Sequence, residues 1–108
     1  MAKAVKWTEM AWDDLANVAD YIAKDSRYYA AAFVREVREA VRSLRRFPER
    51  GTIVGEVGDP NIREIYVRQY RLIYQVAKTV SILAFVHGAR NLEALWKRQR
   101  HSRKPPNN

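Results

Sequence analysis

The chain has no cysteine among its 108 residues and only two histidines. The missing cysteine excludes disulfides, thiolate catalysis and cysteine-ligated zinc, and two histidines far apart in the sequence argue against a transition-metal site. The longest apolar run, residues 82–86, is far too short to span a bilayer, and the first residues lack the apolar stretch of a secretory signal. We therefore expect a cytoplasmic protein with no metal, no cofactor and no membrane partner.

The common enzyme signatures are also missing. The sequence contains no glycine-rich phosphate loop, no nucleophile elbow and no His/Glu pair at metal-binding spacing. What is present is a formal net charge of +8. A basic surface attracts polyanions over long distances, so we expect either nucleic acid or an acidic protein as the partner. Charge alone does not choose between them.

The first half of the chain has the periodicity of two amphipathic helices. Residues 4–7 form a short strand candidate, after which Thr8 is a good N-cap for a helix that ends near Lys24. Asp25 or Ser26 caps a second helix, which residues 47–48 stop. Apolar residues recur at steps of three and four in both helices. They are Ala11, Leu15, Val18 and Ile22 in the first and Ala30, Phe33, Val37, Val41 and Leu44 in the second. The tight turn between them predicts an antiparallel hairpin.

The second half reads as strands, expected at residues 52–57, 62–68, 70–77 and 80–87. The last of these is apolar on both alternate sets of side chains, which predicts a central position in the sheet. Residues 91–100 suit a short C-terminal helix, and residues 101–108 a disordered basic tail. The prediction is one α+β domain over residues 1–100: an N-terminal strand and a helical hairpin packed on a mainly antiparallel twisted sheet.

Several residues in the strands have side chains suited to phosphate chemistry. Arg71 and Arg90 are the best candidates for phosphate contact, because guanidinium is planar, always charged and bidentate toward phosphate. Arg63 and Arg68 would widen the same nucleic-acid surface. The alternative is that these arginines pair with Glu56 or Glu64 and fix the strand register.

Acid–base chemistry has one natural candidate, His87, because its unperturbed pKa lies near neutrality. Glu56, Glu64, Tyr66 and Tyr74 are possible companions of His87, although each also suits an ordinary role in cross-strand packing or pairing. A structural role for His87 is the open alternative. The aromatic residues Trp7, Trp12, Phe33 and Phe85 are interpreted as core or interface residues and not as platforms for base stacking.

The order of these elements, with several short motifs, resembles the RelE/ParE toxins of bacterial toxin–antitoxin modules. The motifs are Val5-Lys6-Trp7, Phe47-Pro48-Glu49-Arg50-Gly51, Tyr70-Arg71-Leu72-Ile73-Tyr74 and Val86-His87-Gly88-Ala89-Arg90-Asn91-Leu92. The resemblance implies a growth-arresting toxin held inactive by an antitoxin with an acidic, amphipathic C-terminal segment. ParE-like members block DNA gyrase, whereas RelE-like members cut mRNA on the ribosome.

The two branches imply different site residues. For the ribonuclease branch the resemblance assigns Arg71 and Arg90 as catalytic arginines, with His87 and Glu64 as substitutes for an acid–base pair that this chain lacks. For the ParE branch, which the helical hairpin and the ending at residues 86–92 favour, we expect target contacts from Trp96, Lys97 and Arg98. A third alternative is a non-toxic basic module that only binds nucleic acid.

Overall fold

The computed structural model describes residues 2–88. Its elements, in chain order, are β1 (Val5–Trp7), α1 (Glu9–Ala23), α2 (Arg27–Arg46), β2 (Thr52–Ile53), β3 (Ile62–Val67), β4 (Tyr70–Val76) and β5 (Val80–His87). The predicted α+β fold is confirmed. The expected helix at residues 91–100 and tail at residues 101–108 lie outside the described residues, as do Arg90, Trp96, Lys97 and Arg98.

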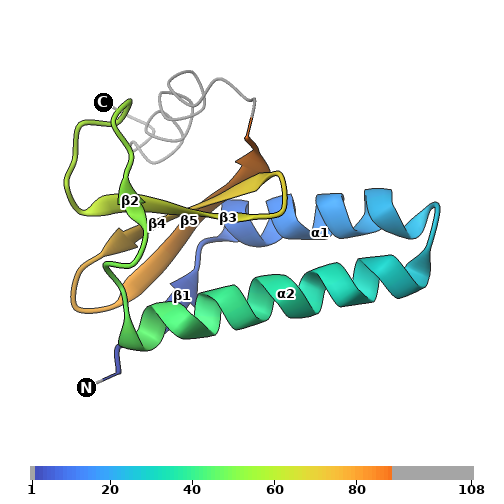
Figure 1. Cartoon of the computed structure of the whole chain (residues 1–108), viewed down its shortest axis with the longest axis horizontal. Helices are drawn as coiled ribbons and strands as arrows, with labels where there is room; N and C mark the ends of the chain where they lie inside the picture. The colour runs from blue at the N-terminus through green and yellow to red at the C-terminus, as the bar shows by residue number, and fades with distance from the viewer. Residues whose placement is uncertain (1, 89–108) are drawn as a thin grey trace, which may run out of the picture.

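The helices start at side-chain caps. The Thr8 hydroxyl accepts a hydrogen bond from the Ala11 N–H, and the Ser26 hydroxyl accepts one from the Tyr29 N–H. Ser26 is therefore the cap of α2, and not Asp25. The two helices form the predicted antiparallel hairpin, whose turn extends beyond the sheet (Figure 1).

The sheet has the strand order β1-β5-β4-β3-β2. Strands β2 to β5 pair antiparallel along the chain, whereas β1 pairs parallel with β5. This arrangement places β5 between β1 and β4, as its apolar sequence predicted. It leaves β1 and β2 as the two edge strands of the described sheet.

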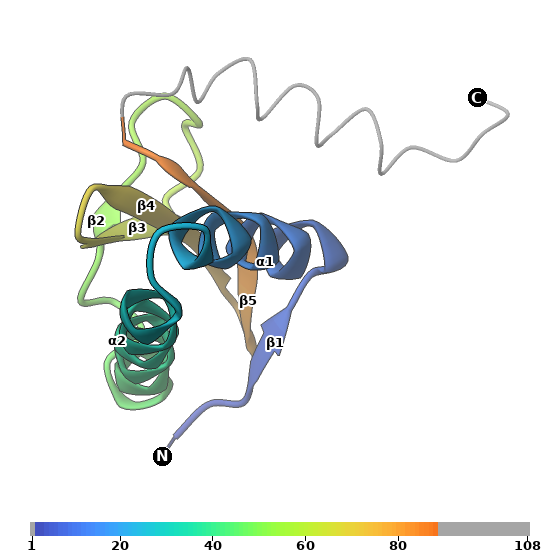
Figure 2. The same ribbon diagram turned by 90° about the vertical axis from the view of Figure 1, so that its right-hand side faces the viewer.

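The helical hairpin covers one face of the sheet (Figure 2). The core on that face contains Phe33 and Val37 of α2, Leu72 and Tyr74 of β4 and Phe85 of β5, among others. A second cluster of buried residues occupies the opposite face. It combines Val54, Ile62, Ile73, Leu83, Ala84 and Val86, with Val57 packed against it. Because Val54 and Val57 belong to the β2–β3 segment, this loop folds over the second face.

Two predictions about the strands were wrong. The strand expected at residues 52–57 ends at Ile53, because the following residues fold over the sheet as that loop. The alternation predicted for β5 also breaks: opposite Ile73 and Tyr74 the register moves from Ala84 to Ile82. Leu83 is thus the extra residue of a β-bulge, and Leu83 and Ala84 both join the second cluster.

Among residues 2–88, no helix has both the length and the apolar character needed to cross a membrane.

Candidate functional site

Of the sheet residues suited to phosphate chemistry, one arginine, Arg71, is buried. Register pairs Arg71 of β4 with Tyr66 of β3, and Glu64 follows diagonally on the same face. Arg71 is the only buried charged residue of the described chain, with 6% of its surface exposed. Alternation along β4 explains its position: Leu72 and Tyr74 point to the helices, so Arg71 points to the opposite face.

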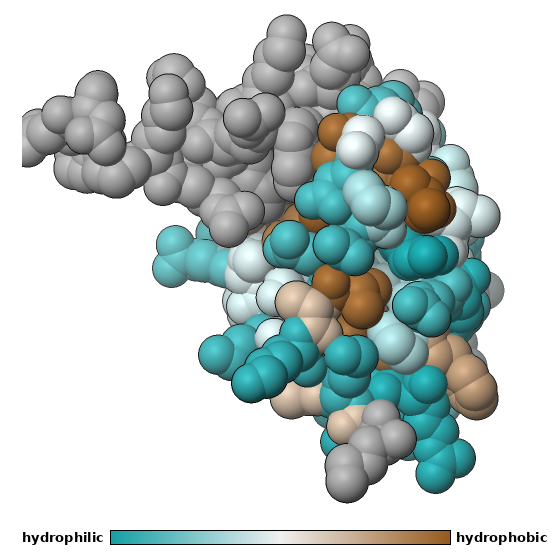
Figure 3. All heavy atoms as spheres, turned by 90° about the vertical axis from the view of Figure 1, so that its left-hand side faces the viewer, coloured by the Kyte–Doolittle hydropathy of each residue, from teal (hydrophilic) through white to brown (hydrophobic). Residues whose placement is uncertain are grey.

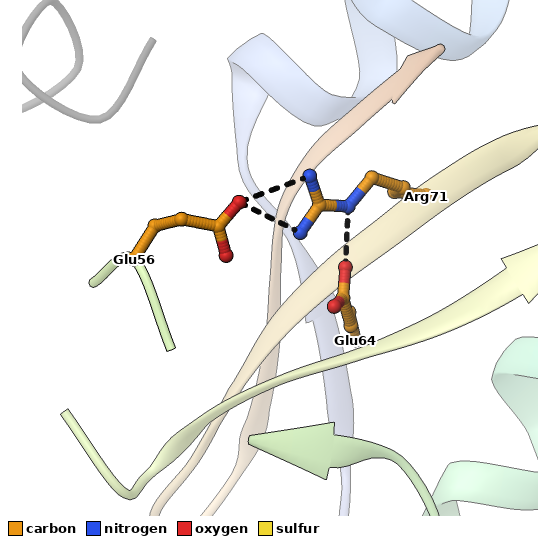
Figure 4. Close-up of polar contacts among 3 residues, drawn as sticks. All are labelled: Glu56, Glu64 and Arg71. Carbon is orange, nitrogen blue, oxygen red and sulfur yellow. Dashed lines mark hydrogen bonds and ion pairs between the residues drawn. The ribbon is translucent and has the colours of Figure 1, made fainter. Parts of the chain in front are cut away.

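Two carboxylates surround the guanidinium of Arg71 (Figure 4). Its Nε donates to Glu64 Oε1 at 2.5 Å, and its two Nη atoms lie 3.4 and 3.5 Å from Glu56 Oε2. Glu64 comes from the neighbouring strand, whereas Glu56 reaches over from the β2–β3 loop. The Glu64 side chain is 14% exposed and that of Glu56 is 46% exposed. The three groups together carry a formal charge of −1.

The electrostatics follow from these contacts. The hydrogen bond to Glu64, aided by Glu56 and opposed by burial, raises the pKa of Arg71 above its ordinary value. The pKa of Glu56 is lowered, mainly by a hydrogen bond from its own backbone, with a smaller contribution from Arg71. Arg71 is therefore permanently charged and already satisfied by acids of its own chain. The sequence left open whether its arginines contact phosphate or pair with Glu56 or Glu64. Arg71 pairs with both glutamates.

The other two predicted nucleic-acid arginines of the described chain also contact their own fold. Arg63 Nη1 donates to the backbone oxygens of Glu49 and Gly51, at 3.2 and 2.8 Å. Arg68 pairs with Glu36 of α2 at 2.7 Å. These contacts join the sheet to the segment after α2 and to α2 itself.

Arg68 has a further structural feature that its sequence does not signal. Its backbone has a φ of 56°, in the left-handed region, at the tight turn between β3 and β4. Its guanidinium also lies 5.7 Å from the centre of the Phe33 ring. The pair with Glu36 lowers the pKa of that carboxyl and raises the pKa of Arg68.

His87 lies apart from Arg71 and Glu64. It pairs with Tyr70 across β4 and β5, and the two rings meet edge to face at 5.7 Å. Tyr70 in turn contacts Phe33 of α2, which places this row of rings on the helical face. Arg71 and Glu64 occupy the opposite face, so the described chain does not bring the predicted acid–base pair of His87 and Glu64 together. Their predicted catalytic roles stay predictions.

The motif at residues 47–51 has a structural explanation. The Tyr74 hydroxyl donates to the Pro48 carbonyl at 2.7 Å and accepts from the Gly51 N–H at 3.0 Å. Burial raises the pKa of Tyr74, which keeps its proton available for this bond. A Cβ at Gly51 would lie 2.5 Å from the Tyr74 oxygen and 2.6 Å from the Glu64 carbonyl oxygen, so only glycine fits.

Sequence reasoning did not identify Asp14 as an anchor. Its Oδ2 accepts a hydrogen bond from the Phe85 N–H at 3.1 Å, beyond the point where β1 stops pairing with β5. A backbone N–H at a buried strand edge needs a hydrogen-bond acceptor. In the sequence, Asp14 lies on the polar side of an amphipathic helix, and nothing in that pattern indicates that its carboxylate caps a strand.

The surface around the end of α2 and the β2–β3 loop is mainly hydrophilic, with separate apolar patches (Figure 3). The part of the chain that the structure describes has no cluster of three or more His, Cys, Asp or Glu side chains that could hold a metal ion.

Comparison with known proteins identifies the family. Residues 5–92 match the family model of the ParE toxin of the type II toxin–antitoxin system parDE. Among solved structures, the chromosomal ParDE system from P. aeruginosa gives a TM-score of 0.65 at 22% identity, covering 80% of this chain and 96% of that one. The RelBE2 toxin–antitoxin complex from Mycobacterium tuberculosis gives 0.56 at 25% identity, covering 81% and 99%. No curated protein matches the sequence. The family match spans most of the chain, and the chain therefore belongs to the ParE toxins of type II toxin–antitoxin systems.

Proposed function

We propose that this toxin arrests growth by inhibiting DNA gyrase in the cytoplasm and that a cognate antitoxin neutralises it. The main support for the proposal is that Arg71 is buried and paired with two glutamates. To act in RNA cleavage, Arg71 would have to face the phosphate and stabilise its developing charge. Here the Arg71 side chain is 7% exposed and its guanidinium lies between two carboxylates, so a phosphate would have to displace Glu56 or Glu64.

The arrangement of the acid–base candidates supports the same choice. Cleavage needs a base and an acid within hydrogen-bond reach of one ribose–phosphate group. His87 lies on the helical face and Glu64 on the opposite face, so they do not flank one substrate. A toxin that acts by docking on a protein needs no such set. Trp96, Lys97 and Arg98 remain the proposed target contacts, through an aromatic anchor and two cations.

The deciding experiment compares gyrase and mRNA directly. The purified chain should block supercoiling of relaxed plasmid by gyrase, and addition of the antitoxin should restore it. Transcripts mapped by primer extension after induction should show no new ends. Discrete cuts within codons on translated mRNA would instead establish the RelE-like ribonuclease, and salt-sensitive RNA binding without growth arrest would establish a basic binding module.

Variants sharpen this comparison. Trp96→Ala with Lys97→Glu should abolish gyrase inhibition while leaving the melting temperature unchanged. Lys78→Glu, which changes an exposed cation in the β4–β5 turn, is the matched control and should inhibit like the wild type. His87→Gln should have no effect on growth arrest. A loss of arrest in a folded His87→Gln variant would favour RNA cleavage.

A further inference from the structure

The motif at residues 47–51 contains one side chain that the described core does not include, Phe47. The rest of the motif has a structural explanation, because Pro48 and Gly51 bond with the Tyr74 hydroxyl through their backbones. The Phe47 side chain is 64% exposed, whereas the two other phenylalanines of the chain are buried. A single exposed ring is not unusual by itself, so its surroundings decide whether it can bind a ligand.

Phe47 ends α2. Its backbone has a φ of −125° and a ψ of 65°, outside the helical region, and the proline that follows does not continue the helix. The ring therefore lies at the end of α2, and the turn of the helical hairpin lies at the other end of this helix (Figure 1).

Two hollows meet at Phe47. Their volumes are about 560 and 540 Å³, within the usual range of ligand sites. Ser43, Arg46 and Phe47 line both of them. The other lining residues are Ala2, Glu39, Arg42 and Arg45 in the first and Pro48, Glu49 and Arg50 in the second. Phe47 is thus part of the boundary that the two hollows share.

Cations predominate around this ring. Four arginines and two glutamates line the two hollows, which gives the lining a formal charge of +2. The side chains of Arg45 and Arg50 each donate one hydrogen bond to their own fold. Arg42 and Arg46 are exposed, and neither forms an ion pair with another described residue. Both are therefore available to an anionic ligand.

The helix end explains part of this charge without any ligand. Cations in the last turn of a helix stabilise it through its dipole, and Arg45 and Arg46 occupy that turn of α2. The explanation does not extend to Arg42, about one turn earlier, or to Arg50, which lies beyond the helix. It also gives no reason for an exposed ring beside them.

We propose that the end of α2 binds single-stranded nucleic acid, with bases stacked on Phe47 and phosphates held by Arg42 and Arg46. The ring offers a flat face to any base, and guanidinium binds phosphate through two parallel N–H donors. A strand that passes from one hollow to the other places successive nucleotides beside the same ring. This activity goes beyond gyrase inhibition and depends on neither gyrase nor the antitoxin.

Other anionic ligands use less of this surface. An acidic peptide would pair with the arginines but has no need of an aromatic ring at the boundary of two hollows. A nucleic-acid duplex would contact the arginines too, but its bases are already stacked on one another and would leave Phe47 in water. An unpaired strand uses the ring, the hollows and the cations together.

The first test measures binding of a labelled oligothymidylate of about 12 nucleotides to the full chain by fluorescence anisotropy. Its bases do not pair with one another and are free to stack. Phe47→Ala should weaken binding by about fivefold or more, through loss of one stacking platform. Tyr21→Ala is the matched control, because Tyr21 is an aromatic residue near the hairpin turn that is 69% exposed, and it should bind like the wild type.

A duplex of the same length separates stacking from charge. Its affinity for the chain should be the same for Phe47→Ala and the wild type, because paired bases do not reach the ring. If Phe47→Ala left the affinity for the single strand unchanged, or weakened both ligands equally, stacking on Phe47 would be excluded.

The second test measures the arginines through the salt dependence of binding. Arg42→Gln with Arg46→Gln should lower the slope of log affinity against log salt by about 1.4, because each phosphate contact of a single strand contributes about 0.7. Lys24→Gln with Arg27→Gln makes the same change of net charge at the hairpin turn, roughly 20 to 30 Å away along α2. That distance exceeds the screening length, so the slope should stay that of the wild type.

Equal losses in the two double variants would overturn the site, because they would mean general attraction to the net charge. An Arg42→Gln/Arg46→Gln chain that melts at a lower temperature but binds the oligonucleotide like the wild type would assign these arginines to the helix end alone. Absence of binding at low salt would overturn the proposal as well.

Two competitors test the chemistry of the ligand. An oligoglutamate of equal charge should compete poorly, and competition as strong as that of the oligothymidylate would replace nucleic acid with an acidic protein. An RNA strand of the same length should bind within about threefold of the DNA strand, because the ring and the guanidiniums contact base and phosphate and not sugar. A strong preference for one sugar would contradict this mode of binding. Since the assay contains no gyrase, a chain that fails to inhibit gyrase leaves these results intact.

Discussion

Arg71 Nε and Glu64 Oε1 are 2.5 Å apart on the face of the sheet that the helices leave uncovered. Both side chains are largely buried, so the pair has little water to compensate for the loss of either partner. The second carboxylate, Glu56, is farther away and more exposed. The two glutamates of this site thus differ in what they contribute to stability.

Glu64→Gln should destabilise the fold by about 3 kcal/mol, because it leaves the buried Arg71 charge without its closest counter-charge. Glu56→Gln should cost under about 1 kcal/mol, since its ion pair is long and half-exposed. Urea unfolding followed by circular dichroism measures both. Equal losses in the two variants would contradict this ranking of the carboxylates.

Acid should weaken the fold partly through Glu56. Its pKa in the folded chain lies below the ordinary 4.5, so its contribution is complete above that pH and is lost as the pH falls through the folded value. Glu56→Gln has no such titration. Its melting temperature should therefore fall less between pH 6 and pH 3 than that of the wild type. Parallel curves for the two proteins would show that Glu56 does not contribute, and Glu49→Gln serves as the exposed control.

The core on the helical face depends on Phe33, which is fully buried and contacts the rings of Tyr70 and Phe85. Phe33→Ala should cost about 3–5 kcal/mol, from lost burial and the cavity left behind. Phe47→Ala removes a phenylalanine that is 64% exposed and should cost far less. Thermal denaturation of both variants tests the contrast, and a wild-type melting curve for Phe33→Ala would exclude its burial.

The helical hairpin was predictable from its apolar periodicity, and the interior position of β5 from its apolar residues on both faces. Leu15 on the apolar stripe of α1 and Phe33 and Val37 on that of α2 are buried as expected. Strand β5 has the predicted bounds. An apolar pattern shows which face of a helix or strand packs on the core, because that face is determined by the residues of the element itself and not by distant segments.

The departures arise where distant segments decide the structure. A bulge at Leu83 follows from the pairing of β4 with β5 and leaves no mark in an apolar strand. The loop over the second face converts expected strand residues such as Val54 and Val57 into a cover for the sheet. Arg71 suited phosphate contact and register pairing equally, and only the positions of Glu56 and Glu64 distinguish the two.

The turn after α2 gives the last prediction. A Cβ at Gly51 would lie 2.5 Å from the Tyr74 oxygen and 2.6 Å from the Glu64 carbonyl oxygen, and the latter is backbone of β3 that cannot move alone. Gly51→Ala should therefore destabilise the fold by about 1–3 kcal/mol through overpacking and the weakened Tyr74 bond. Gly55→Ala is the matched control, because a Cβ there meets nothing within 4 Å. It should be neutral or stabilise slightly by restricting the unfolded chain. Chemical denaturation of both variants measures the difference, and a Gly51→Ala protein as stable as Gly55→Ala would show that the Tyr74 contact is not tight.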